Sequence, residues 1–172
     1  NGVFSIDFKV PRDISFGPNK ANIKFYAQRL DSTNTQPAAG AIPMKIAATT
    51  DNNTRDTTGP QIILYLNDTT FKNGGLTHEN PVLIAKLFDT SGINATGNGI
   101  GHDIVLVLNG EERNSIVLNS FFSNEINEYR RGNLRYQLPQ LPPGKHRIKL
   151  KAWDLVNNSN TGELDLTVEN KE

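Results

Sequence analysis

The 172-residue chain contains no cysteine, one tryptophan and one methionine. Disulfide bonds, thiolate chemistry and cysteine-ligated zinc are therefore excluded, and packing alone must stabilise the fold. No apolar run approaches the roughly 20 residues that a membrane-spanning helix requires. The sequence also opens without the charged and apolar segments of a signal peptide. It opens in a strand-like segment instead, so we expect a piece of a longer protein.

An excess of charge of either sign is also missing, because 18 basic residues balance 18 acidic ones. The basic residues are scattered, and no cluster of them could neutralise a row of phosphates, so no nucleic-acid partner is expected. Hydrophobic residues make up 36% of the chain, which is less than in typical globular proteins. Asn, Thr, Gly and Pro are abundant, and this composition favours short strands joined by turns.

Residues 1–57 predict strands of a first β region followed by a linker. Val3–Val10 alternates apolar and polar residues, as a half-buried strand does. Weaker strand patterns follow at Ile23–Leu30 and Ile42–Ala48, and Thr49–Gly59 contains no apolar residue at all. Three strands cannot close a sandwich alone. They either complete a domain with strands from upstream or pack onto the region that follows.

Residues 58–172 predict an immunoglobulin-like antiparallel β-sandwich, so the expected fold class is all-β, with the three-strand segment of a further β domain before it. The turn signals have the spacing typical of a sandwich. Asn109-Gly110 predicts a tight turn between two strands, whereas Phe121–Gly132 is expected to be irregular or a short helical turn. Seven strands are expected, at Gln61–Leu66, Val82–Phe88, His102–Leu108, Ser115–Leu118, Leu134–Leu138, His146–Trp153 and Leu164–Val168.

The strand that ends at Trp153 has the clearest pattern. It follows Pro142-Pro143-Gly144-Lys145, a sequence suited to a type II turn. Apolar residues then alternate with cations, so one face is expected in the core and the other in solvent. A slip of one residue would bury the cations, which specifies the register. The alternating residues are Arg147, Ile148, Lys149, Leu150, Lys151 and Ala152.

Two phrases resemble bacterial immunoglobulin-like modules. Leu141–Asp154 with Asn157-Asn158-Ser159 resembles their penultimate strand and final turn, and Thr57-Thr58-Gly59-Pro60 resembles their opening. Combined with three further segments, they resemble the C-terminal non-catalytic region of the surface sortase of the type IX secretion system in Bacteroidota, a PorU-like family of gingipain-like cysteine peptidases. The resemblance covers essentially the whole chain. The further segments are Leu64–Asp68, Asp89–Asn94 and Thr96–Asp103.

The resemblance implies a peptidase domain upstream and a sorting-signal domain downstream. Family members remove C-terminal signals from cargo and attach the cargo at the cell surface. Their catalytic Cys and His would lie outside this chain, so no catalytic residue is assigned here. The implied role is that of a structural or docking module at the extracellular side of the outer membrane of a Gram-negative bacterium. The implied partners are neighbouring domains of the same polypeptide and outer-membrane components of the secretion system, without direct membrane insertion.

A carbohydrate-binding or adhesin-type immunoglobulin-like module is the alternative interpretation. Stacking on a sugar needs an exposed aromatic ring, and Trp153 is expected on the outward side of its strand beside Lys151. No cofactor is predicted. The histidines His78, His102 and His146 lack the spacing of metal ligands, and His146 is expected at the rim of the sandwich with its ring hydrogen-bonded.

Oxygen-bearing side chains at Asp89, Asn94 and Asp103 form a weak calcium pattern, since Ca²⁺ prefers carboxylate and carbonyl oxygens. Asp89 before Ser91-Gly92 is explained more simply as an Asx-turn residue. No metal site is therefore assigned.

The remaining candidates are docking residues. Aromatic and charged residues are interleaved between Phe121 and Arg131, and aromatic residues and Arg are favoured at the centres of interfaces. These residues either dock a neighbouring domain or plug the open end of the sandwich, and the second interpretation is favoured. The docking candidates are Phe121, Phe122, Tyr129, Arg130, Arg131 and Trp153.

Overall fold

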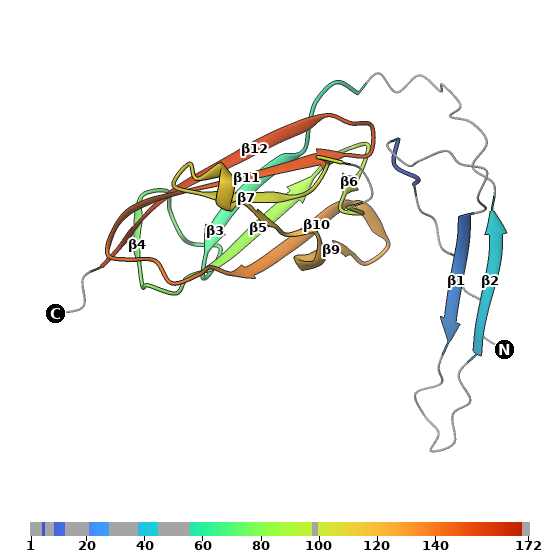
Figure 1. Ribbon diagram of the computed structural model, residues 1–172, viewed down its shortest axis with the longest axis horizontal. Coiled ribbons are helices and arrows are strands. Elements are labelled where there is room, and N and C mark those ends of the chain that lie inside the picture. Colours follow the sequence, from blue (N-terminus) through green and yellow to red (C-terminus); the bar gives the residue numbers. More distant parts are fainter. Residues whose placement is uncertain are drawn as a thin grey trace, which may run out of the picture. The chain divides into compact units, whose positions relative to one another are not determined.

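The computed structural model describes residues 5, 9–12, 21–27, 38–44, 56–97 and 100–169. The chain divides into two compact units, one made of Asn1–Ile14 with Arg55–Glu172 and the other of Ser15–Thr54. Among the described residues the only helical elements are two short 3₁₀ turns, and none is long and apolar enough to cross a membrane. The strands are β1 (Ala21–Ala27), β2 (Ala38–Met44), β3 (Gln61–Leu66), β4 (Gly75–Thr77), β5 (Val82–Phe88), β6 (Ile93–Asn94), β7 (Val105–Leu108), β8 (Ile116–Val117), β9 (Phe122–Glu125), β10 (Glu128–Gln137), β11 (Gly144–Asp154) and β12 (Ser159–Val168), and the 3₁₀ turns are η1 (Glu112–Asn114) and η2 (Asn119–Phe121) (Figure 1).

The smaller unit contains the antiparallel pair β1–β2. Both strands begin earlier than the sequence predicts, since Ala38–Gly40 belongs to β2 rather than to a loop. Small residues have low strand propensity, and Pro43 suggested a break, but a proline is tolerated on an edge strand. The predicted strand Val3–Val10 lies largely outside the described residues. Of its members that are described, Ser5, Lys9 and Val10 are not in a strand.

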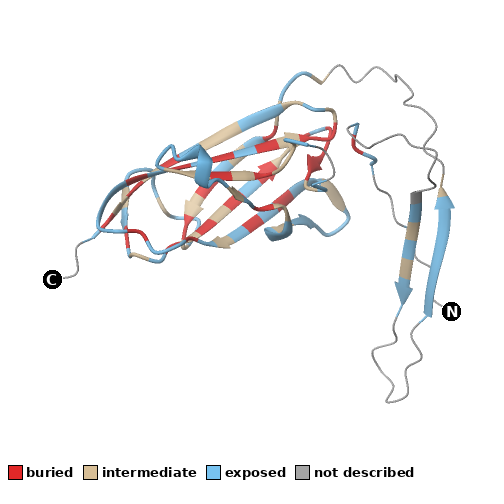
Figure 2. Ribbon diagram, in the orientation of Figure 1, coloured by how far each residue is buried: buried red, intermediate tan, exposed pale blue. Residues whose placement is uncertain are grey.

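The larger unit is a sandwich of two sheets (Figure 1). One sheet has the order β3-β5-β10-β9, and the other has the order β4-β12-β11-β7-β8 with β6 paired to β11. Every pair is antiparallel except β12 with β4. Buried residues alternate with exposed ones along the strands (Figure 2), so the core lies between the sheets. Its largest contributors include Leu66, Leu83, Leu106, Leu134, Ile148, Leu150 and Leu166.

The register of β11 is the predicted one. Ile148, Leu150 and Ala152 are 0% exposed, while Lys149 and Lys151 between them face solvent. The first residue of β11, Gly144, has a φ of 131°, in the region that glycine tolerates best.

The segment Phe121–Gly132, predicted to be irregular, contains β9 and the start of β10 instead. Glu125 pairs with Glu128 across a turn in which Asn127 has a φ of 58°. The register then shifts before Gly132, as at a β-bulge. A Cβ at Gly132 would lie 2.2 Å from the Phe122 ring, so that ring occupies the space a side chain would need. The bulge and the glycine interrupt the alternation, which is why the sequence did not predict these strands.

Other boundaries differ by a few residues. The hairpin around Asn109-Gly110 forms as predicted, with Leu106 opposite Ile116 and positive φ at both turn residues, although η1 lengthens the connection. β12 begins at Ser159 rather than Leu164, because its polar first half pairs with β11.

Candidate interaction site

The predicted docking residues lie in several places. Phe121 is 45% exposed and makes an edge contact with Tyr136, with ring centroids 4.8 Å apart. Phe122 is half-buried and packs against the core. The Arg130 side chain donates two hydrogen bonds to Glu128 and its backbone N–H a third, and together they lower the pKa of Glu128 to about 2. The docking role of these residues stays a prediction.

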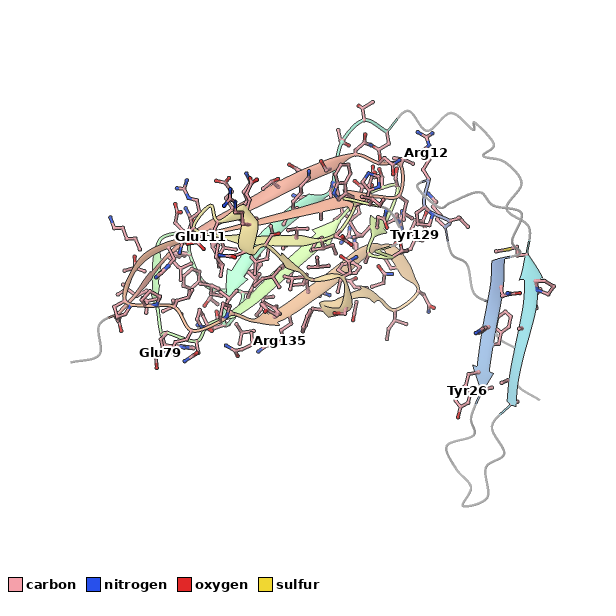
Figure 3. All side chains as sticks on the ribbon, viewed as in Figure 1. Arg12, Tyr26, Glu79, Glu111, Tyr129 and Arg135 are labelled. Atoms are coloured by element: carbon pink, nitrogen blue, oxygen red, sulfur yellow. The ribbon has the colours of Figure 1, made fainter. Side chains whose placement is uncertain are left out.

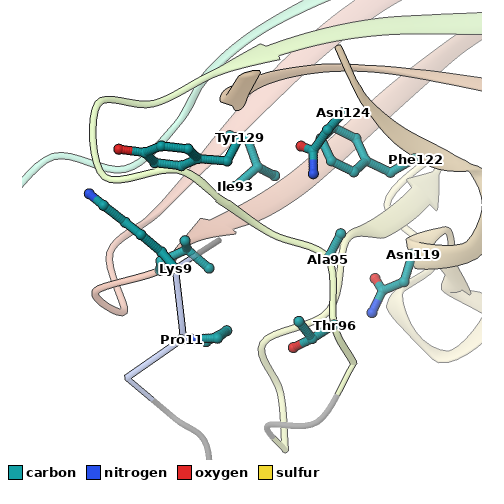
Figure 4. Close-up of a pocket in the computed structure, with 10 residues that line it drawn as sticks. Lys9, Pro11, Ile93, Ala95, Thr96, Asn119, Phe122, Asn124 and Tyr129 are labelled. Carbon is teal, nitrogen blue, oxygen red and sulfur yellow. The ribbon is translucent and has the colours of Figure 1, made fainter. Parts of the chain in front are cut away.

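Phe122 and Tyr129 both line a pocket of about 300 Å³ at the end of the sandwich (Figure 4). Lys9 and Pro11 form one wall of the pocket. Pro11 is buried there, the Arg12 N–H donates to the Leu155 carbonyl at 2.9 Å, and the Lys9 ammonium lies 4.9 Å from the centre of the Tyr129 ring. The N-terminal segment therefore covers part of this end. The remaining lining residues are Ile93, Ala95, Thr96, Asn119, Asn124 and Leu155.

Arg131 and Trp153 belong to different sheets. Arg131 stacks over the Phe88 ring at 4.7 Å. The Trp153 ring is only partly exposed and contacts both the His102 ring, at 4.3 Å, and the Lys151 ammonium, at 4.5 Å. These two neighbours already cover part of the ring on which a sugar would stack, which counts against the carbohydrate-binding alternative. The Trp153 indole N–H is buried without a hydrogen-bond partner.

His146 is buried, and its ring is held at both nitrogens. Nδ1 lies 3.0 Å from the Asn109 amide nitrogen, and Nε2 lies 2.7 Å from the Pro142 carbonyl. This arrangement suits a neutral ring that donates from Nε2 and accepts at Nδ1. It is the hydrogen-bonded rim position that the sequence predicts.

The three residues of the calcium pattern have separate partners. Asp89 accepts a hydrogen bond from the Ser91 N–H, Asn94 accepts from Thr96, and Asp103 accepts from Asn119. In the described part of the chain, one group of potential metal ligands is brought together, and it consists of Asp56, Asp89 and Asp154, whose ligand atoms lie within 4.8 Å of one another. Carboxylate oxygens of this kind suit a hard cation such as Ca²⁺. The weak calcium pattern of Asp89, Asn94 and Asp103 stays untested, and no metal site is assigned to it.

The sequence did not select Asp56 or Asp154 because each has an ordinary local explanation. Asp56 lies in the linker, and Asp154 precedes a turn. Asp154 is 0% exposed, and it accepts hydrogen bonds from the N–H groups of Val156 and Asn158. The only local signal for their meeting is that Asp89 and Asp154 each continue the inward-facing row of a core strand.

Burial raises the pKa of Asp89 to about 6, and the negative charges of Asp154 and Asp56 add to the effect. Asp56 shows the opposite shift. A hydrogen bond from the Ser91 hydroxyl is the largest cause of its lowered pKa, with further bonds from Thr58 and Thr90. At neutral pH this end of the sandwich therefore concentrates negative charge.

The fold defines an immunoglobulin-like β-sandwich module with a separate β-hairpin unit. Comparison with protein-family models and with curated protein sequences gave no match. Among solved structures, the chain is similar to dimeric latent PorU from Porphyromonas gingivalis, with 30% sequence identity and a TM-score of 0.66 over 95% of this chain. The resemblance to a PorU-like region that the sequence predicts is therefore confirmed. The chain spans 15% of the length of that PorU chain.

Two other solved structures are more distant. The endo-β-1,4-mannanase from Thermotoga petrophila has 15% identity and a TM-score of 0.42, over 71% of this chain and 22% of that one. CopC from Methylosinus trichosporium OB3b has 15% identity and a TM-score of 0.37, over 64% of this chain and 100% of that one. Neither likeness bears on function.

Proposed function

We propose that this chain is a non-catalytic structural and docking module of a secreted gingipain-like cysteine peptidase, which acts as the sortase of the type IX secretion system at the outer-membrane surface. The likeness to PorU over 95% of the chain carries the proposal. A catalytic cysteine would have to come from another part of the polypeptide, because this chain contains none.

The module would act as a rigid spacer that positions other domains. Its two sheets share one well-packed core, and most of the large core residues are completely buried. A close-packed sandwich of this kind is stiff, so it can hold a peptidase domain at a fixed distance and orientation from an anchor. The proposed partners are the neighbouring domains of the polypeptide and the outer-membrane components of the secretion system.

Cleavage of cargo that carries a C-terminal sorting signal tests this function. The full-length polypeptide should release the signal, and the same polypeptide with its catalytic cysteine replaced should not. The isolated 172-residue chain should release none. Signal cleavage by the isolated chain would overturn the non-catalytic role, and failure of the full-length polypeptide to cleave would overturn the sortase assignment.

A further inference from the structure

The outer face of the β3-β5-β10-β9 sheet has an unusual composition. The outer face of an antiparallel sheet that faces solvent normally carries polar residues. Along β3 and β5 the residues that point away from the core include Ile63, Ile84 and Phe88, because their strand neighbours Leu64, Ala85 and Leu87 are the buried ones. Ile63 is 42% exposed. This face therefore leaves apolar surface in contact with water.

Three cations lie among these apolar residues. Lys86 points outward from β5, and Arg131 and Arg135 point outward from β10, opposite Phe88 and Ile84. Figure 3 shows Arg135 on the side of the sandwich away from β11 and β12. In the described part of the chain the ion pairs are Arg130–Glu128 and Arg147–Asp165, and none of the three cations takes part in either.

The same face is hollowed. A depression of about 280 Å³ lies beside Ile63, Phe88 and Arg131, with Glu125 and Asn133 also on its margin. The Arg131 guanidinium covers the Phe88 ring at 4.7 Å, so a cation and an aromatic face are presented together. Aromatic residues and Arg are enriched at protein–protein interfaces. The depression could receive an apolar side chain, with the cations beside it free to meet carboxylates.

We propose that this face, here called the β5 patch (Ile63, Ile84, Lys86, Phe88, Arg131 and Arg135), is the interface for an adjacent domain of the same polypeptide. The contacting surface of that domain carries an apolar side chain surrounded by carboxylates. The proposal rests on the proposed function, which makes this chain one part of a longer protein.

Charge decides against a second copy of this chain as the occupant. A twofold dimer would place the β5 patch against itself. The three cations would then face the same three cations, with Glu125 the one acidic residue on the margin of the depression. Like charges brought together in this way oppose association. A tethered domain with complementary charge meets no such penalty, and its high effective concentration favours a modest interface.

Hydroxyl-radical footprinting of the isolated 172-residue chain and of the full-length polypeptide tests the inference. Oxidation of Ile63 and Phe88 should be slower by about five-fold or more in the full-length polypeptide, because the centre of an interface excludes water. Val117 and Leu76 are 53% and 64% exposed and lie outside the patch, so their oxidation serves as the control. Equal oxidation of Ile63 and Phe88 in the two proteins would overturn the inference.

Charge reversal adds a matched pair of variants. Arg131→Glu in the full-length polypeptide should return the oxidation of Ile63 to the rate of the isolated chain carrying the same substitution, whereas Lys149→Glu, on the outer face of the other sheet, should not. Protection that appears in the isolated chain as its concentration rises, together with a dimer in sedimentation, would overturn the choice of partner.

The footprint does not depend on peptidase activity. A polypeptide that protects the β5 patch without cleaving cargo supports the interface and overturns only the sortase assignment. One that cleaves cargo but leaves the patch exposed overturns only the interface.

Discussion

The two outer faces of the sandwich use cations in different ways. On β11 the outward residues Lys145, Arg147, Lys149 and Lys151 form one row, and the outward row of β12 beside them includes acidic residues. Arg147 pairs with Asp165 at 2.7 Å, and Glu163 lies opposite Lys149. On β5 and β10 the outward cations have apolar and aromatic neighbours instead. Two of the four cations on the β11 face, Arg147 and Lys149, thus lie opposite carboxylates of β12, whereas none of the cations of the β5 patch lies opposite a carboxylate on its neighbouring strand.

The contrast shows that an outward position does not by itself define a solvated surface. Both faces lie over the same core and are built by the same alternation, but only one has the composition of a surface that stays in water. Substitutions should therefore separate three environments, which are the core, the β11 face and the β5 patch.

The largest effect is expected within β11 itself. Leu150→Ala removes a side chain that is 0% exposed, and deletions of this kind cost about 2–5 kcal/mol of unfolding free energy because a cavity remains. Lys149→Ala, one residue away on the solvated face, should change it by less than about 0.5 kcal/mol. Urea unfolding of both variants measures the difference. Similar losses would show that the alternation of faces is wrong.

The next largest loss of stability is expected at Asp154, the charged residue that ends the inward-facing row of β11. Asp154→Ala removes the acceptor of the Val156 and Asn158 N–H groups, and buried donors left unpaired cost about 1–3 kcal/mol. Asp154→Asn keeps one carbonyl acceptor and should lose less. Chemical denaturation at pH 7 compares the two. Equal losses would mean that the charge matters rather than the hydrogen bonds.

Asp89 continues the inward-facing row of β5, so it is the corresponding buried charged residue on the other sheet, and its charge can be tested by changing the pH. Its pKa is about 6 in the folded protein and 3.8 as the ordinary value. The folded state therefore binds the proton more tightly, and the contribution of Asp89 to stability is fully present below about pH 4 and lost as the pH rises through about 6. Asp89→Asn should raise the unfolding free energy by about 1–2 kcal/mol at pH 7.5, and by much less at pH 4.

Thermal or urea unfolding of the wild type and Asp89→Asn at several pH values gives this difference directly. Asp56, whose pKa is lowered, is present in both proteins, so subtracting the two curves removes most of its opposite trend. A constant difference from pH 4 to 7.5 would contradict the raised pKa.

The smallest effect is expected for charge reversal on either outer face of the isolated chain. Arg131→Glu and Lys149→Glu replace exposed side chains and should each change the unfolding free energy by less than about 0.5 kcal/mol. Urea unfolding measures both. A large loss for Arg131→Glu alone would mean that Arg131 stabilises its own module, and would weaken the contrast between the faces.

Local chemistry explains which parts of the fold the sequence predicts. In β11 the turn residue Gly144 and the strict alternation through Ala152 agree, so the strand and its register follow from neighbouring residues. In β10 the bulge before Gly132 breaks the alternation, and the ring that fills the space comes from Phe122 on another strand. A contact between side chains of two different strands cannot be predicted from a short stretch of sequence.

The same limit applies to the candidate sites. The hydrogen-bonded rim position of His146 follows from its place beside a turn. The meeting of Asp56, Asp89 and Asp154 joins a linker and the ends of two strands from different sheets, so only the complete topology reveals it. The β5 patch is also non-local, since it combines residues of β3, β5 and β10. Its outward apolar positions were visible, but near-continuous apolar strands such as β3 gave no indication of which face was covered.

Asp56 also has a mechanical consequence. Its carboxylate accepts hydrogen bonds from Thr58, Thr90 and Ser91, and its carbonyl accepts one from the Asn158 side chain. A pulling force on the chain upstream of Asp56 would load these bonds before it reached the ladder between β3 and β5. The linker is thus hydrogen-bonded to the sandwich ahead of its first strand, so these bonds would break before the ladder between β3 and β5 carried the load.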